Sequence, residues 1–329
     1  MLFNFYGFSW QAKFLSCRKC IEKIWLCRED VVILQSDIFL MEMNKKTDVA
    51  LVLSSGGARG LAHIGVIEEL VEQGYHISSI AGCSMGALIG GIYAAQGLDA
   101  FRQWMQTITM RRMLELTDFS LSLNHLVKGE RIIDAMKEVV PDVCIEDLPI
   151  PFCAVATDWE NGCEVVFRKG KLFDAIRASI SLPSFFNPVR RDGMILIDGG
   201  VINPLPLNRV TRHEGDLLVG VDVSGHDYQG QNRLQHALSV RRRQQSTLKD
   251  ALLNKLRPSS LEFNYITLLS RTSSLMIRQN ARLMTELMKP DLLIDIQMNR
   301  FGSFDYNQSE RLIAIGRSKA REALENFNG

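Results

Sequence analysis

The stretch that decides the fold is residues 77–96, ISSIAGCSMGALIGGIYAAQ, in which an apolar run meets a glycine-rich turn and then a second apolar segment. Residues 77–81 predict a buried strand, and residues 85–96 predict a helix of small and apolar side chains. The turn between them reads Gly82-Cys83-Ser84-Met85-Gly86, which has the pattern G-x-S-x-G. A serine on a sharp strand-to-helix turn has a strained backbone and an exposed hydroxyl, so Ser84 is the candidate nucleophile. The alternative is a glycine-rich turn that only closes a strand–helix unit.

A second unit of the same kind precedes this one. Residues 49–60 read VALVLSSGGARG, an apolar run typical of a strand covered on both faces, followed by a glycine-rich turn. Apolar residues then recur at helical spacing and predict one buried stripe, which consists of Leu61, Ile64, Ile67, Leu70 and Val71. Two strand–turn–helix units in succession indicate a parallel sheet with helices on its faces.

The rest of the chain continues the α/β pattern. Short apolar runs predict further strands over residues 152–156, 165–167, 195–197, 217–223 and 292–296. Helices are expected over much of residues 99–146, and over 173–180 and 308–326. No linker rich in Pro, Gly or Ser divides the chain, so we expect one domain over residues 47–329.

The first 46 residues differ in composition from this domain. Residues 1–40 are enriched in Phe, Trp and Cys and lack the pattern of a secretory signal. We interpret residues 1–46 as an N-terminal extension and expect the natural start of the protein at Met41 or Met43. The alternative is a short amphipathic appendage that packs on the domain.

The charge balance excludes some functions. The 38 Lys and Arg residues and 37 Asp and Glu residues leave a formal charge of +1, which gives no support for binding nucleic acid through bulk electrostatics. The seven cysteines are an odd number in a chain long enough to bury a core, so we expect reduced thiols and a cytoplasmic location. Cys17 and Cys20 form a C-x-x-C pattern that Cys27 follows, but a fourth ligand is missing near them, so we expect no metal site.

One segment is strongly basic. Residues 233–257 predict a helix with seven basic side chains and one acidic side chain, Asp250. Such a segment could place the protein at the surface of a membrane with anionic headgroups, as a peripheral contact. A solvated helix face is the more common explanation of such a charge run.

A serine nucleophile requires donors for the oxyanion that it creates. Gly56 and Gly57 follow the first strand, and their N–H groups are not screened by side chains, so they are candidate oxyanion donors. Arg59 stands at the start of a helix, where a cation opposes the helix dipole. We therefore expect Arg59 to hold the loop in shape or to reach an anionic part of the substrate.

The proton of the serine must pass to a base. None of the six histidines, His63, His76, His125, His213, His226 and His236, is distinguished by its surroundings. Asp198 is distinguished, because it ends the apolar run 195–197 and precedes Gly199 and Gly200. It would therefore lie at the carboxyl edge of the sheet, where the sites of α/β proteins form. A free aspartate titrates near pH 4 and is a poor base, so this role requires burial to raise its pKa. The alternative is a turn residue bonded to its own backbone.

These motifs together resemble the patatin-like phospholipases, which share a catalytic core with cytosolic phospholipase A2. The likeness covers about residues 49–210 and rests on the glycine loop together with the segments 81–87, 177–189 and 198–200. Within this family, the chain looks most like the small bacterial single-domain members. The resemblance implies a three-layer α/β/α fold with a central, mostly parallel sheet.

The resemblance also implies roles for individual residues. Ser84 would be the nucleophile and Asp198 the base of a Ser–Asp dyad, with Gly56, Gly57 and Arg59 at the oxyanion hole. The remaining motif positions would be Gly60, Gly82, Gly86, Gly199 and Gly200. The implied function is hydrolysis of fatty acyl esters of lipids through an acyl-enzyme, in lipid catabolism, with no cofactor or metal. The loop departs from the family pattern G-G-G-x-R-G at Ser55, which leaves the conformation of that residue open.

Three other functions use some of the same features. A dinucleotide-binding module is disfavoured, because residue 55 is not Gly and the strand 77–81 is not followed by the acid that binds a ribose. An esterase or thioesterase acting on soluble substrates would use the same residues. A non-catalytic lipid-binding protein is disfavoured by the presence of both Ser84 and Asp198.

Overall fold

A computed structural model describes residues 47–107, 129–183, 185–225, 265–297, 301 and 306–328. The expected extension 1–46 and the basic segment 233–257 lie outside these residues. Eight strands form one sheet: β1 (Asp48–Leu53), β2 (His76–Cys83), β3 (Phe152–Asp158), β4 (Cys163–Phe167), β5 (Val189–Arg191), β6 (Met194–Asp198), β7 (Leu217–Asp222) and β8 (Leu292–Asp295). The α-helices are α3 (Ala62–Glu72), α4 (Met85–Ala94), α5 (Leu98–Thr107), α7 (Glu130–Lys137), α8 (Leu172–Ser179), α11 (Tyr265–Met288) and α12 (Ser309–Asn328). Short 3-10 helices are η3 (Gly57–Leu61), η4 (Ile145–Asp147), η5 (Gly199–Val201) and η6 (Tyr306–Gln308).

The centre of the sheet is parallel, as predicted. Strands β8, β7, β1, β2 and β3 lie side by side in that order, and each neighbouring pair is parallel. The antiparallel strand β4 extends the sheet beyond β3, and β6, which pairs with β5, is antiparallel to β3 as well. A tight turn joins β5 to β6. It contains Asp192 and Gly193, which both have positive φ and belong to residue types that favour turns.

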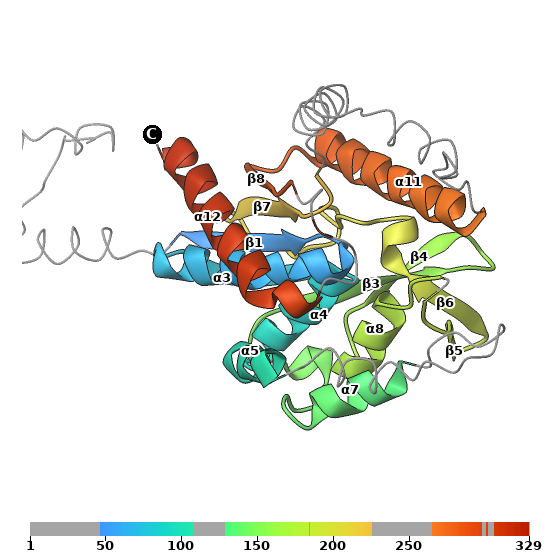
Figure 1. Ribbon diagram of the computed structural model, residues 1–329. Coiled ribbons are helices and arrows are strands. Elements are labelled where there is room, and N and C mark those ends of the chain that lie inside the picture. The colour runs from blue at the N-terminus through green and yellow to red at the C-terminus, as the bar shows by residue number, and fades with distance from the viewer. Residues whose placement is uncertain are drawn as a thin grey trace, which may run out of the picture. The chain divides into compact units, whose positions relative to one another are not determined.

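Helices cover both faces of the sheet, which confirms the three-layer α/β/α architecture (Figure 1). The side chains of β1 show the division, because Val49, Leu51 and Leu53 belong to the main core together with α3, α4, α8 and α12. The alternate residues Ala50 and Val52 face a smaller core, which the loop after η5 and helix α11 complete. A strand whose successive side chains enter opposite cores must be apolar throughout, which explains the unbroken run in the sequence.

Two parts of the prediction need correction. The stripe on α3 is buried at Leu61, Ile64, Ile67 and Leu70, but Val71 is 47% exposed. Val71 lies in the last turn of α3, where the described elements leave it about half exposed. The sequence also gave no sign of helix α11, the longest described helix. None of the helices in the described part of the chain has the length and apolar content that crossing a bilayer requires.

Candidate functional site

The turn between β2 and α4 has the strained conformation that the G-x-S-x-G pattern predicts. Ser84 has φ 54° and ψ −120°, a backbone conformation that residues other than glycine rarely adopt. Gly86 is required by close approach, because a Cβ there would lie 2.2 Å from the carbonyl oxygen of Leu53 at the end of β1. A Cβ at Gly82 would lie 2.5 Å from the carbonyl oxygen of Gly86. The two glycines therefore let the turn fold back on itself and on the neighbouring strand.

Strand register brings the second half of the site to this turn. Strand β4 occupies one edge of β3 over residues 154–158, so β2 and β6 must both lie along the other edge. They approach from opposite directions, with Cys83 of β2 opposite Val155 and Asp198 of β6 opposite Ala156. The two strands thus end at adjacent positions of β3. This juxtaposition places Ser84 and Asp198 side by side although 114 positions separate them in the sequence.

Ser84 and Asp198 are joined by a short hydrogen bond. The Ser84 hydroxyl donates to Oδ2 of Asp198 at 2.6 Å, and both side chains are buried, with 8% and 3% of their surfaces exposed. Oδ1 of Asp198 accepts the N–H of Gly200 at 2.7 Å, so each carboxylate oxygen has one donor. Asp198 therefore accepts a hydrogen bond from the backbone of its own turn and one from Ser84 at the same time. Gly199 is required by packing, since a Cβ there would lie 2.2 Å from the carbonyl oxygen of Val155.

Burial changes the acidity of this carboxyl group. It raises the pKa of Asp198 from 3.8 to about 6, against the hydrogen bonds from Ser84 and Gly200, which lower it. The group is therefore mostly ionised at pH 7 but is a much better proton acceptor than a free aspartate. Burial also raises the pKa of Cys83 well above its usual value, and the charge of Asp198 adds to this, so the neighbouring thiol stays protonated.

The glycine loop lies against both partners of the pair. A Cβ on Gly60 would lie 2.3 Å from Cγ of Met85, next to the serine, and a Cβ on Gly200 would lie 2.9 Å from Oγ of Ser55. Gly57 has φ 57° and requires glycine, whereas Ser55 is absent from the residues with positive φ. A side chain is therefore tolerated at position 55. Within the described residues, the N–H groups of Gly56 and Gly57 donate to no protein acceptor.

Arg59 holds this loop in shape. Its Nε donates to the carbonyl oxygen of Gly56 at 3.1 Å, which is the first of the two roles expected from the sequence. Burial lowers the pKa of Arg59, the charge of Asp222 raises it, and the charge of Arg278 lowers it. The last effect shows that α11 comes close to the glycine loop.

The described histidines have other partners. His63 is fully buried, and its Nε2–H donates to the carbonyl oxygen of Ser54 at 2.9 Å. Burial lowers its pKa to about 4, so it stays neutral. His76 pairs with Asp48, and His213 with Asp216. His125, His226 and His236 lie outside the described residues.

Two residues near the pair carry interactions that the sequence did not reveal. Ser179, at the end of α8, accepts the N–H of Ser84 through its Oγ at 2.8 Å and donates to the carbonyl oxygen of Val155 at 2.6 Å. The available signal was that Ser179 is the one polar residue on the otherwise apolar, buried side of α8. Burial raises the pKa of Tyr306 to about 12, and the charge of Asp198 adds to this, so this hydroxyl remains neutral.

Comparison with known proteins shows the family of this segment. The family model described as patatin-like phospholipase matches residues 51–210, a segment that contains the glycine loop, Ser84 and Asp198. Residues 51–210 form a patatin-like phospholipase domain. The resemblance predicted from the motifs is thereby confirmed.

Several known proteins are similar to part of this chain. An uncharacterized NTE family protein of Mycobacterium tuberculosis is 48% identical over 179 residues, 54% of this chain and 50% of that protein. The neuropathy target esterase sws of Drosophila melanogaster is 29% identical over 229 residues, 63% of this chain and 16% of that protein. The chain thus spans about half the length of the mycobacterial relatives it matches. Among solved structures, VipD from Legionella pneumophila covers 86% of this chain and 67% of its own, with 14% identity and a TM-score of 0.44.

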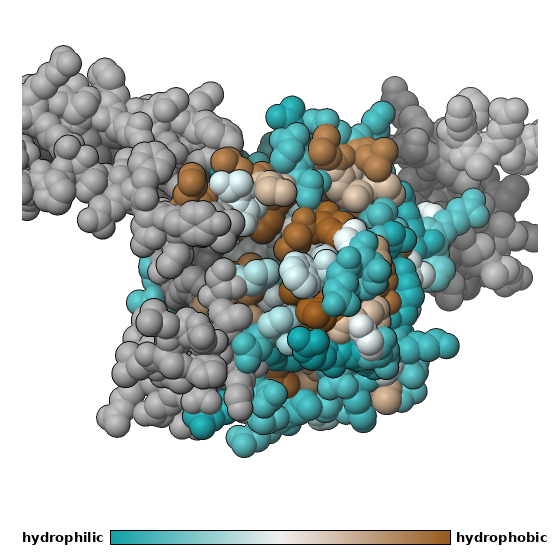
Figure 2. All heavy atoms as spheres, turned by 90° about the vertical axis from the view of Figure 1, so that its right-hand side faces the viewer, coloured by the Kyte–Doolittle hydropathy of each residue, from teal (hydrophilic) through white to brown (hydrophobic). Residues whose placement is uncertain are grey.

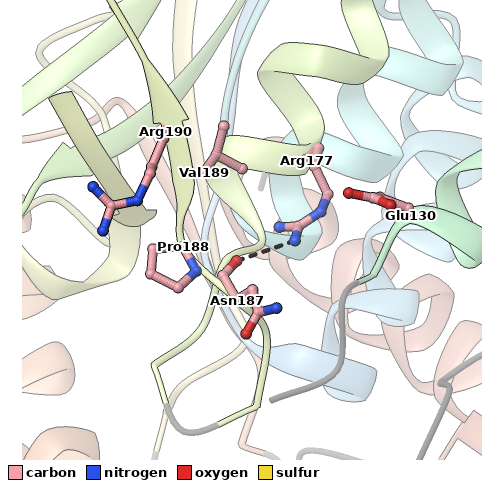
Figure 3. Close-up of a pocket in the computed structure, with 6 residues that line it drawn as sticks. All are labelled: Glu130, Arg177, Asn187, Pro188, Val189 and Arg190. Atoms are coloured by element: carbon pink, nitrogen blue, oxygen red, sulfur yellow. Dashed lines mark hydrogen bonds between the residues drawn. The ribbon is translucent and has the colours of Figure 1, made fainter. Parts of the chain in front are cut away.

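The patatin-like domain also has a polar cavity of about 380 Å³ (Figure 3). Its lining residues are Glu130, Arg177, Asn187, Pro188, Val189 and Arg190. Figure 3 shows the carboxylate of Glu130 pointing toward Arg177, whose guanidinium donates to the carbonyl oxygen of Asn187 at 3.0 Å. Arg177 also donates to Oγ of Ser181, whose carbonyl oxygen accepts the N–H of Asp198. The cavity is therefore connected to the pair by a chain of hydrogen bonds, but neither Ser84 nor Asp198 lines it.

Proposed function

We propose that this protein is a serine hydrolase that cleaves fatty acyl esters of lipids, of the phospholipase A or lysophospholipase type. The observation that carries the proposal is the 2.6 Å hydrogen bond from the Ser84 hydroxyl to the buried Asp198 carboxylate. The description of the matching family as phospholipases and the name of the related esterase support the substrate class. The role of the enzyme would be in lipid catabolism.

The reaction would proceed by acyl transfer in two steps. Asp198 accepts the Ser84 proton while Oγ attacks the ester carbonyl carbon, and a tetrahedral oxyanion forms. Protonated Asp198 then gives its proton to the leaving alcohol, which leaves an acyl group on Ser84. In the second step a water molecule transfers a proton to Asp198 and attacks the acyl carbon, and the fatty acid departs as the proton returns to Ser84.

The raised pKa of Asp198 supports its role as the base. A carboxyl group with a pKa of about 6 both accepts the serine proton and returns it to the leaving group near neutral pH. A carboxylate is nevertheless a weaker base than a histidine, so the oxyanion would need strong stabilisation. We assign this to the N–H groups of Gly56 and Gly57, with Arg59 holding their loop.

The test is hydrolysis of phospholipid and lysophospholipid by the full chain, with released fatty acids measured by mass spectrometry. Ser84→Ala and Asp198→Asn should each lower turnover by at least about a thousandfold. Wild-type turnover in either variant would refute the dyad. Hydrolysis confined to water-soluble esters, even with vesicles present, would favour the soluble esterase instead.

A further inference from the structure

Helix α11 has an unusual number of apolar side chains on the surface. Nine large apolar residues are exposed in the described part of the chain, and five of them lie on this one helix. They are Leu268, Leu275, Met276, Leu283 and Leu287, which we call the outer face of α11. Their spacing of seven, eight or four residues places them along one side of the helix. The exposed fractions range from 50% to 73%.

The outer face is not the side that packs on the sheet. Ala281, Met284 and Met288 join the small core on that side, together with Leu205 and Leu207. A surface helix normally has a single apolar stripe, which faces the core. A second apolar stripe on the same helix indicates a surface for interaction. Helix α11 lies on the right-hand side of Figure 1. Figure 2 views the molecule from that side and shows apolar side chains exposed there.

The helix borders the catalytic pair. Nδ2 of Asn280 donates to the carbonyl oxygen of Val201 at 3.2 Å, and Val201 is the third residue after Asp198. Arg278, two residues earlier in the same helix, is close enough to Arg59 to affect its pKa. The outer face therefore belongs to an element that contacts the turn following Asp198 and lies near the glycine loop.

The charge of this region favours an anionic partner. Helix α11 contains three arginines and one acid, Glu286, which forms an exposed ion pair with Arg282 at 2.8 Å, so the basic residues of the helix outnumber the acid. In the sequence, α11 follows residues 233–257, in which seven side chains are basic and one is acidic. The whole chain has a net charge of only +1, so basic residues are concentrated in this part of the sequence. Apolar side chains combined with basic ones are the composition of helices that lie in a membrane interface.

We propose that the outer face of α11 inserts into the boundary between headgroups and acyl chains of an anionic lipid bilayer. The inference rests on the proposed function in one respect, since a lipid hydrolase must meet its substrate at such a surface. Insertion would bring the bilayer next to the turn that carries Asp198. A lipid could then reach Ser84 without first dissolving in water.

The first experiment measures binding without hydrolysis. Full-length Ser84→Ala protein is floated with vesicles of phosphatidylcholine containing one third phosphatidylglycerol. The double variant Leu283→Gln with Leu287→Gln should reduce the bound fraction by about tenfold or more, because both residues are exposed and glutamine preserves the helix. Val71→Gln on α3 is the matched control, since Val71 is 47% exposed and lies on another element, and it should bind as the parent does. Equal binding of the parent and the double variant would overturn the inference.

The second experiment separates this inference from the proposed function. With Ser84 present, the double variant should hydrolyse a monomeric short-chain ester at the wild-type rate and lose activity only on vesicles. Wild-type activity of the double variant on vesicles would overturn membrane insertion but leave the hydrolase proposal intact. If the wild type hydrolyses no ester but binds vesicles through the outer face, the hydrolase proposal is refuted and membrane insertion stands. A wild-type dimer that becomes a monomer in the double variant would instead assign the outer face to a second copy.

Discussion

Replacing Asp198 by asparagine is expected to abolish turnover and at the same time to make the fold more stable. The carboxylate is buried beside Ser84, and burial raises its pKa from 3.8 to about 6. An asparagine retains an oxygen for the N–H of Gly200 and has an amide that can donate to the Ser84 hydroxyl. The substitution therefore removes the buried charge while both hydrogen-bonded positions stay occupied.

The size of the gain follows from the pKa shift. Below the unfolded pKa, Asp198 is protonated in both the folded and the unfolded state, so its burial does not lower the free energy of unfolding. As the pH rises toward the folded pKa of about 6, the buried carboxyl lowers the free energy of unfolding more and more, and the loss is complete above that pH. A shift of about two units corresponds to about 3 kcal/mol once the group is fully ionised. At pH 8 the asparagine variant should thus be more stable by up to about 3 kcal/mol, and at pH 5 by roughly half of that.

Thermal and denaturant unfolding at pH 5 and pH 8 measure this difference. A gain of about 3 kcal/mol corresponds to roughly 5–10 °C in Tm for a domain of this size. Ser84→Ala is the control, because it is also expected to be inactive but removes a hydrogen bond that lowers the pKa of Asp198. It should therefore be less stable than the wild type at pH 8. An asparagine variant that is less stable than the wild type, with a gap independent of pH, would refute the buried ionised carboxylate.

Three further predictions concern the same site. With a soluble ester, kcat/KM should rise about tenfold per pH unit below pH 6 and level off above it, because Asp198 must be ionised to accept a proton. A pH profile of kcat/KM with its midpoint near pH 4 would mean that burial does not raise the pKa of the base. Gly199→Ala should lower the free energy of unfolding by about 1–3 kcal/mol in denaturant titrations, because its Cβ would lie 2.2 Å from the carbonyl oxygen of Val155. Unchanged stability would contradict the tight packing of the turn after β6 against β3. Ser55→Gly should keep kcat/KM within about threefold of the wild type, since residue 55 has no positive φ and only the backbone of the loop is needed. A large change in kcat/KM would assign the Ser55 hydroxyl a role in the reaction.

The features that the sequence predicted are those encoded within a few neighbouring residues. The apolar runs of β1 and β2, the strained turn at Ser84 and the aspartate followed by two glycines are all short and strongly patterned. The register that joins them is a long-range property. That β2 and β6 meet head to head along one edge of β3 depends on β4 occupying the other edge, and no local pattern records this.

Helix α11 escaped prediction for a related reason. Its apolar residues lie on two sides, Ala281, Met284 and Met288 toward the sheet and the outer face toward the surface. Two apolar stripes obscure the single helical period on which such a prediction depends. The role of Ser179 was also hidden, because its partners Ser84 and Val155 come from other elements.

The central claim is that the Ser84 hydroxyl is an activated nucleophile, and covalent labelling tests it most directly. The full chain is treated with a fluorophosphonate, and the mass of the intact protein and of its peptides is measured. We expect one adduct per chain, located on Ser84, absent in Ser84→Ala and formed far more slowly in Asp198→Asn. A wild-type protein that takes up no label, or an adduct located on a residue other than Ser84, would contradict the account.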